Sequence, residues 1–264
     1  MRFTDGSRGT TNFSIQLKAL GLALSALVVV GLCVRTYDRN RDYATPRTLW
    51  EKTSASVPEN VRALSNATRL LGDDARAESN PSLRDQIFKR AFSFANMAVK
   101  SNPGYGRAFT ERGRLKQSTG DLQGAYDDFT KAIDVFPNDP DAYVNRGQIF
   151  HERDPAAADA NYSAALRIMP STTIAAINRA ALRHAMGRTS EALADYDNVL
   201  NYRPDHAMSW SNRGIVLDQL GRYAEALESH KKARFYYAQL DYQPGVDRAR
   251  AEIERLRKLA NPAR

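Results

Sequence analysis

"NRAALRHAMGRTSEALADYDNVLNYRP" (178–204) contains the signals that decide how this chain folds. A small residue at Ala180 is followed by Gly187, by Ala192 and then by Tyr196, and a proline closes the stretch at 204. Glycine and proline at such spacings end helices. The stretch therefore predicts two helices that are joined by a tight turn.

The same pattern recurs along the chain with a nearly constant period. The first small residues are spaced 34, 33 and 34 positions apart, at Gly113, Gly147, Ala180 and Gly214. A second small residue and an aromatic residue follow in each unit, at Ala125 and Phe129, Ala158 and Tyr162, Ala192 and Tyr196, and Ala226 with His230 in the aromatic place. We expect the first small residue to face the second, with the aromatic ring between neighbouring helix pairs. A repeated unit of this kind cannot bury its apolar face alone, so the units must stack.

This small–aromatic–alanine–proline pattern resembles the tetratricopeptide repeat. The resemblance covers about residues 46–260. It implies an all-α fold, a right-handed superhelix of helix pairs, with a concave groove that binds a protein or peptide partner. Residues 46–244 are expected to hold about five repeats and a leading half-repeat that ends near Pro58, with a polar loop inserted at 72–85. Residues 245–264 are expected to form a capping helix and tail, because such arrays need a covered end.

The N-terminal part of the chain carries a separate signal. The run "ALGLALSALVVVGLCV" (19–34) has sixteen residues without a charge, and residues 12–17 can extend it toward the roughly 20 that a spanning helix needs. We expect residues 1–35 to contain an N-terminal tail and a single transmembrane helix, with membrane contact over 12–34, followed by a linker over 36–45. A cleaved signal peptide is the alternative interpretation.

Two further observations concern the membrane topology. The basic residues on the two sides of the apolar run are nearly equal in number, so charge alone does not decide the orientation. Residues 39–64 resemble the junction between membrane and repeats in membrane O-mannosyltransferase-like proteins, which implies a periplasmic or lumenal repeat domain. This chain has no room for the sugar-donor loop of those enzymes. The expected location is therefore a single-pass membrane protein with exported repeats, and the alternative is a repeat domain that faces the cytoplasm.

Composition argues against several other classes of function. The net charge is +8, but the excess lies near the two ends of the chain, and the body is almost neutral. A nucleic-acid groove needs clustered cations with stacking aromatics, and none is visible. The single cysteine permits no internal disulfide. The four histidines are scattered, so we expect no metal, no cofactor and no catalytic site.

The arginine of each triplet, Arg112, Arg146, Arg179 and Arg213, is expected to pair within its own unit. The expected partners lie just before the aromatic position, at Asp128, Asn161, Asp195 and Ser229. The pairs of arginine with aspartate are expected to be partly buried, and such pairs more often specify packing than add stability.

The asparagine before each arginine is the candidate binding residue. Asn145, Asn178 and Asn212 would line the concave groove, and an amide side chain can bond both groups of a peptide backbone. Similar asparagine ladders hold peptide backbone in the tetratricopeptide superhelix of O-GlcNAc transferases. The alternative is that these amides only bridge neighbouring helices. The remaining groove candidates are Arg114, Gln148, His151 and His184.

The function expected from the sequence is therefore a membrane-anchored, non-catalytic interaction module with a protein or peptide partner. Two alternatives stay open. The chain could be a structural subunit of a larger membrane or cell-envelope assembly, or a non-catalytic relative of the repeat tail of a glycosyltransferase.

Overall fold

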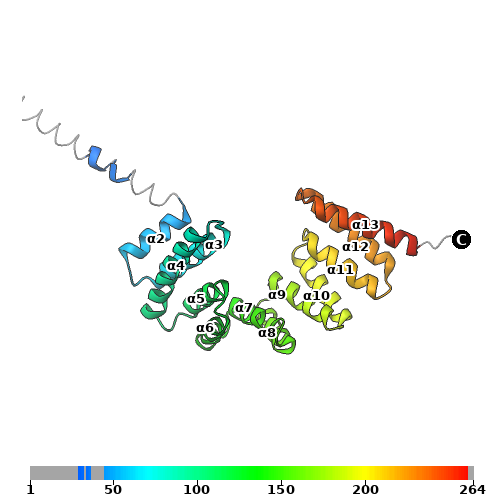
Figure 1. Cartoon of the computed structure of the whole chain (residues 1–264), viewed down its shortest axis with the longest axis horizontal. Helices are drawn as coiled ribbons and strands as arrows, with labels where there is room; N and C mark the ends of the chain where they lie inside the picture. The colour runs from blue at the N-terminus through cyan, green and yellow to red at the C-terminus, as the bar shows by residue number, and fades with distance from the viewer. Residues whose placement is uncertain (1–28, 33, 37–44, 261–264) are drawn as a thin grey trace, which may run out of the picture.

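The computed structural model describes residues 29–32, 34–36 and 45–260, with the exception of the side chain of residue 260. The described chain is helical and contains no strand. The helices follow one another as a curved row of antiparallel pairs (Figure 1). Their bounds are α2 (Pro46–Ser56), α3 (Val61–Ala77), α4 (Pro81–Ser101), α5 (Gly106–Ser118), α6 (Leu122–Val135), α7 (Pro140–Phe150), α8 (Pro155–Ile168), α9 (Thr173–Ala185), α10 (Thr189–Tyr202), α11 (Ala207–Gln219), α12 (Tyr223–Gln239) and α13 (Gln243–Ala260).

The turns inside the repeats form where the sequence predicts them. Gly120, Gly187 and Gly221 have φ angles of +86°, +75° and +71°, a left-handed conformation that glycine adopts without steric cost. The unit without such a glycine uses Asp154 instead, whose side chain accepts a hydrogen bond from the backbone N–H of Ala157 at the start of α8. A capping carboxylate satisfies one of the free donors at a helix start.

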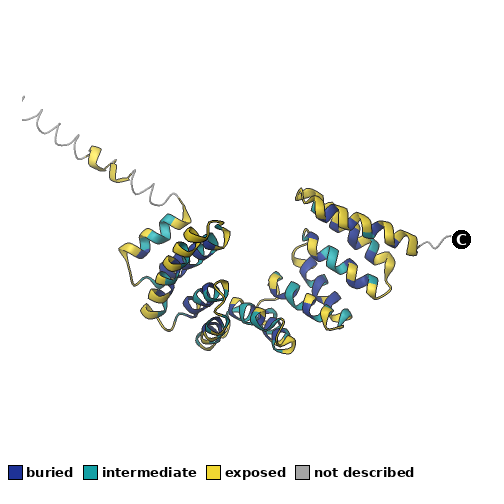
Figure 2. Cartoon of the chain, in the orientation of Figure 1, coloured by how far each residue is buried: buried dark blue, intermediate teal, exposed yellow. Residues whose placement is uncertain are grey.

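Within three of the four helix pairs, the first small residue is a glycine that lies against the aromatic ring. A Cβ atom added at Gly113, Gly147 or Gly214 would lie 2.6–2.8 Å from the aromatic ring of the same unit. In these three units the atoms nearest to the glycine therefore belong to the aromatic ring, while Ala180 and Ala192 of the remaining unit lie in one buried cluster with Tyr196, as expected. In the glycine units the flat ring lies directly on the bare glycine backbone. The aromatic residues are at most 1% exposed, and buried residues fill the interior between successive helices (Figure 2).

The polar loop predicted at 72–85 is confined to residues 78–80. Helix α3 continues to Ala77 and α4 already begins at Pro81, so the extra residues lengthen both helices of this pair. Gly72 is buried against the side chain of Leu115 rather than ending the helix. Asn80 caps α4, and Pro81 occupies its first turn, where proline is well tolerated.

The two ends of the array match the sequence expectation more closely. Helix α2 forms the leading half-repeat and ends two residues before Pro58. Helix α13 covers the last pair, with Val246, Ala249, Ile253 and Leu256 buried along one face. The spacing of these four residues is that of an amphipathic helix.

Within the described ranges, no helix is long and apolar enough to cross a membrane. The predicted anchor at 12–34 falls mostly outside those ranges, which contain only residues 29–32 and 34 of it.

Candidate functional site

The triplet arginines form the most regular polar feature of the molecule. Each one bonds the residue expected from the sequence, on the second helix of its own unit. Arg112 and Arg179 each make two bonds to a buried aspartate, Asp128 and Asp195, at 2.5–3.0 Å. The neutral partners are Asn161, at 2.9 Å from Arg146, and Ser229, at 2.7 Å from Arg213.

Each of these arginines also reaches back to the second helix of the preceding unit. The acceptor always lies sixteen positions earlier in the chain: Asn96, Thr130, Ser163 and Asp197. A guanidinium group carries five N–H donors in a fixed planar fork, so one side chain can serve two helices. These contacts join adjacent units, and we therefore assign the arginines to the scaffold.

The three groove asparagines are not equivalent. Asn178 hydrogen-bonds the hydroxyl of Tyr162, and Asn212 hydrogen-bonds that of Tyr196. Burial raises the pKa of Tyr162 to about 12, against a lowering effect of the Asn178 bond. These two amides link neighbouring units, which matches the bridging interpretation that the sequence left open. Their binding role stays a prediction.

Asn145 is in a different situation because the preceding unit has Phe129, which has no hydroxyl group. Its amide nitrogen donates to the carbonyl of Asp141 in its own helix at 2.8 Å. An asparagine side chain has two N–H donors and one acceptor oxygen. The second N–H and the oxygen of Asn145 are thus left for another group.

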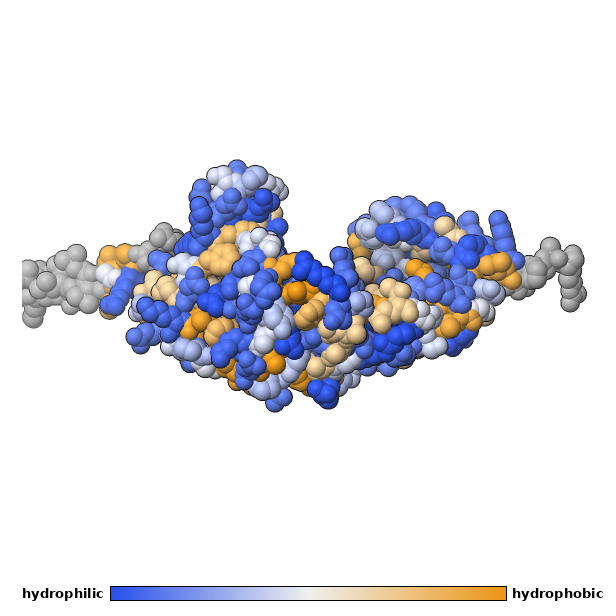
Figure 3. Space-filling view, turned by 60° about the horizontal axis from the view of Figure 1, so that its bottom comes forward, coloured by the Kyte–Doolittle hydropathy of each residue, from blue (hydrophilic) through white to orange (hydrophobic). Residues whose placement is uncertain are grey.

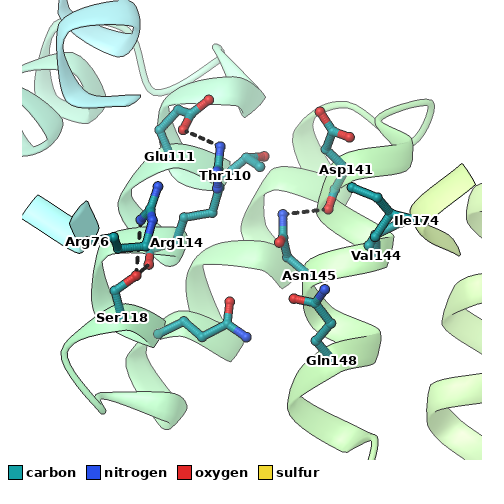
Figure 4. A pocket seen from close by; sticks show the side chains of 11 residues that line it. Arg76, Thr110, Glu111, Arg114, Ser118, Asp141, Val144, Asn145, Gln148 and Ile174 are labelled. Carbon is teal, nitrogen blue, oxygen red and sulfur yellow. Dashed lines mark hydrogen bonds and ion pairs between the residues drawn. The ribbon is translucent and has the colours of Figure 1, made fainter. Parts of the chain in front are cut away.

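A cavity lies next to Asn145, between α5 and α7 (Figure 4). Its volume is about 360 Å³, within the size range of small-ligand sites. Arg114 and Gln148, two other candidates from the sequence, share it with Asn145. The complete lining is Arg76, Thr110, Glu111, Arg114, Gln117, Ser118, Asp141, Val144, Asn145, Gln148 and Ile174.

The two walls of this cavity have different chemistry. On the α5 wall, Arg114 bonds Glu111 at 3.3 Å, and Arg76 from α3 donates to Ser118 at 3.1 Å. On the α7 wall, Asn145 and Gln148 present amide groups toward the opposite helix (Figure 4). The wall from α5 thus carries both signs of charge, whereas the wall from α7 combines the amides with the carboxylate of Asp141 and the apolar Val144.

Glu111 is the most deeply buried charge at the cavity, at 5% exposure. Burial raises its pKa above the ordinary value, and the positive charges of Arg114 and Arg107 oppose this effect. A second cavity of about 520 Å³ adjoins the first through Thr110, Glu111 and Asp141. An elongated ligand could therefore extend past Glu111 into both hollows.

The other two candidates lie outside these cavities. His151 makes a 3.2 Å contact from Nδ1 to the hydroxyl of Tyr162, and His184 makes a 2.7 Å contact from Nε2 to Gln219. Both side chains thus connect helices of the scaffold. In the part of the chain that the structure describes, no group of three or more His, Cys, Asp or Glu side chains could hold a metal ion.

Sequence reasoning missed several residues of the cavity. Glu111 sits directly before Arg112, in the place that asparagine occupies in later units, and this departure from the series was a readable signal. Arg76 was missed because residues 72–85 were assigned to a loop.

The face of the molecule shown in Figure 3 has no single continuous apolar area over the residues that the structure describes. On the side shown in Figure 3, hydrophobic residues lie in separate patches between hydrophilic ones, and the surface is hollowed between the two ends of the arc. Scattered patches of this kind are normal for a protein surface.

Comparison with known protein families identifies the repeats. Two models of the tetratricopeptide repeat match adjoining parts of the chain, residues 110–171 and 171–234. No curated protein matches the sequence.

Solved structures share the fold at low sequence identity. YrrB, described as a TPR protein with an unusual peptide-binding site, is 20% identical with a TM-score of 0.53, over 76% of this chain and 97% of its own. PilW, described as a widely conserved type IV pilus biogenesis factor, is 19% identical with a TM-score of 0.52, over 72% and 92%. The Cut9–Hcn1 structure is 15% identical with a TM-score of 0.60, over 83% of this chain and 40% of the other.

Proposed function

Because residues 110–234 consist of tetratricopeptide repeats, we propose that this chain is an interaction module that binds an extended segment of a partner protein in its groove. The observation that carries the proposal is the cavity between α5 and α7. It brings together Arg114, Asn145 and Gln148, which come from two successive repeats. The peptide-binding site in the description of YrrB, which shares this fold, supports the same reading.

The chemistry of the cavity fits a peptide backbone with a polar side chain. Asn145 has a free acceptor and a free donor, and the amide of Gln148 makes no hydrogen bond to another residue that the structure describes. Amides can pair with the N–H and C=O groups of an extended chain. The charged wall of Arg76, Glu111 and Arg114 would then select the side chain that enters beside it.

A pair of variants tests the proposal. Changing both Asn145 and Gln148 to Ala should weaken partner binding by about five- to 150-fold, because each bond has a net value of about 0.5–1.5 kcal/mol. Thermal stability should change little, since both side chains lie at the groove. Lys131→Ala, at an exposed position on α6 outside the cavity, is the control, and it should leave partner affinity within twofold.

The partner can be obtained by site-specific photo-crosslinking in the intact membrane. A photoreactive residue at Gln117, which lines the cavity, should capture a defined peptide segment. The same residue at Lys131, an exposed position on α6, should not. Crosslinks from Lys131 but not from Gln117 would contradict groove binding and would favour the structural-subunit alternative.

We also propose that residues 12–34 anchor the module in a membrane and that residues 36–264 lie in the periplasm or lumen. The support is the uncharged run at 19–34 in the sequence. The eleven residues from 35 to 45 can span at most about 40 Å, so the array would be held close to the bilayer. Protease added to intact spheroplasts should digest the array, and protection until lysis would contradict this topology.

A further inference from the structure

A separate cavity of about 540 Å³ lies at the C-terminal end of the array, where α11, α12 and α13 meet. It shares no residue with the cavity between α5 and α7. Its lining is Met208, Ser211, Asn212, Ile215, His230, Tyr237, Leu240, Tyr242, Arg248, Ala251 and Glu252.

His230 is the residue that sets this cavity apart. It occupies the aromatic place of its unit and lies against Gly214, as Phe129 and Tyr162 lie against their own glycines. Its side chain is 1% exposed, and neither ring nitrogen has a hydrogen-bond partner. A buried polar group without a partner costs free energy and requires an explanation in a native structure.

The two preceding units show what is missing beside His230. There, the phenol rings of Tyr162 and Tyr196 fill the aromatic place, and their hydroxyl groups bond an asparagine of the next unit. The imidazole ring is shorter and has no hydroxyl, so nothing equivalent extends from α12 toward α13. His230 is part of the lining of the cavity at this end of the series.

Both charged side chains that line the cavity make hydrogen bonds within the protein. Arg248 donates to the hydroxyl of Tyr242 at 3.1 Å and to the carbonyl of Pro244 at 3.3 Å. Glu252 accepts from Arg255 at 2.8 Å. The carboxylate of Glu252 is therefore paired with a cation, whereas the hydrogen bonds of Arg248 go to neutral groups.

Apolar side chains make up much of the exposed part of the lining. Three large hydrophobic residues of the lining are exposed, Met208 at 54%, Ile215 at 41% and Leu240 at 68%. A neutral group with an apolar body and one hydrogen-bonding end satisfies both these side chains and His230. A neutral imidazole offers one donor and one acceptor, and a phenol hydroxyl can serve either.

We propose that this cavity binds a tyrosine side chain of a partner protein, with the ring between Met208, Ile215 and Leu240 and the hydroxyl toward His230. The proposal adds to the proposed function by naming one side chain of the partner. It depends on the proposed function in one respect, namely that the partner is a protein. The added tyrosine would complete the series that Tyr162 and Tyr196 begin.

Two short peptides test the site with the purified full chain. Acetyl-Gly-Tyr-Gly-amide should bind, as measured by saturation-transfer NMR, and should bind about two- to twelvefold more tightly than acetyl-Gly-Phe-Gly-amide, the ratio that one net hydrogen bond supplies. Equal affinities of the two peptides, or no binding of either, would overturn the proposal. So would binding of p-cresol without binding of the tyrosine peptide, because the site would then take free phenols.

Two variants locate the binding. His230→Tyr fills the cavity with the residue of the preceding units and should reduce binding of the tyrosine peptide at least tenfold. Met208→Glu changes only an exposed residue of the lining and should do the same if His230→Tyr does not fold. Unchanged binding in the folded variants would rule the site out. The double change of Asn145 and Gln148 to Ala should leave the binding of these peptides unaffected. The experiment therefore tests the α11–α13 cavity separately from the proposed partner binding between α5 and α7.

Discussion

At the scale of single residues, each triplet arginine joins the second helix of its own unit to the second helix of the preceding unit. The periodicity of the sequence predicted the partner of each triplet arginine within its own unit, because the residue sixteen positions later (fifteen for Arg146) faces the same junction. It did not reveal the second bond of each arginine to the preceding unit. It also treated Asn145, Asn178 and Asn212 alike, although Phe129, sixteen positions before Asn145, lacks the hydroxyl group that Tyr162 and Tyr196 carry.

Loss of an arginine should cost most where its partner is a buried charge. Arg179→Ala leaves Asp195, whose side chain is 5% exposed, with only the 3.1 Å contact of Arg183. We expect a loss of about 1–3 kcal/mol in the free energy of unfolding, below the 3–5 that an entirely unpaired buried charge would cost. Arg213→Ala leaves neutral Ser229 and half-exposed Asp197 and should cost less. Urea denaturation of both variants gives the comparison, and an equal loss in the two would contradict it.

The stability of the array should fall in acid because of His230. Burial lowers its pKa; the negative charges of Glu252 and Asp218 oppose this, and the positive charge of Arg255 adds to it. The unfolded chain therefore binds a proton below about pH 6.5, before the folded chain does. Stability is complete above that pH and declines below it, by at most about 1.4 kcal/mol per pH unit.

His230→Phe is the control for this pH dependence, since Phe129 occupies the same place in another unit. Melting curves from pH 7.5 to pH 5 should show a flatter profile for the variant than for the unaltered chain. Because the remaining ionisable residues are common to both chains, most of their effects cancel in the difference. Parallel profiles would show that His230 contributes nothing to the acid sensitivity.

The contact between glycine and aromatic ring makes a third prediction at this scale. Gly147→Leu places a side chain where even a Cβ would lie 2.8 Å from Tyr162, whose ring is fixed by Asn178 and His151. Overpacking of this kind costs about 1–3 kcal/mol. Gln148→Leu, at the neighbouring exposed position, should leave the midpoint of urea unfolding almost unchanged. A Gly147→Leu variant as stable as that control would contradict the packing described here.

At the scale of helices, the sequence predicted where repeats turn but not how long every helix is. Glycine followed by Asp-Asp at 72–74 has the composition of a loop, yet this glycine is buried in α3 because Leu115 packs against it. Tertiary packing overrides such local preferences. Helix α13 was predicted correctly because its apolar residues follow a regular helical spacing.

Helix α13 should contribute much of the stability of the last repeat. Leu256 is fully buried in one cluster with Val216 and Leu217. Leu256→Ala should cost about 2–5 kcal/mol, the range for truncation of a buried leucine. Leu259→Ala alters an exposed residue of the same helix and should have little effect. A similar loss of stability in the two variants would show that α13 does not cover the core in this register.

At the scale of the whole molecule, contacts run between neighbours along the row. Each helix packs mainly against the helices before and after it in the chain, so stability is a sum of local terms, as expected for repeat proteins. The polar cavity between α5 and α7 and the apolar cavity at α11–α13 are consequently carried by different units. A change in one need not alter the other.

Hydrogen exchange can detect this independence. In the Leu256→Ala variant, amide protection should fall in α11, α12 and α13, while α3 to α6 keep their protection, because no buried cluster joins the two regions. The unaltered chain provides the reference for each amide. A uniform fall of protection in all helices would mean that the array unfolds as one cooperative unit.

The hydrogen bonds of each triplet arginine to two successive units affect how freely these units can move relative to each other. Each guanidinium holds the second helices of two successive units at one fixed spacing, so the joint between them resists rotation about the side chain. Lysine has a single ammonium group on a flexible side chain. It would not hold both helices at a fixed spacing, and the two units could rotate relative to each other more freely. We therefore expect the four arginines, Arg112, Arg146, Arg179 and Arg213, to restrict the angle between successive units. The width of the groove depends on that angle.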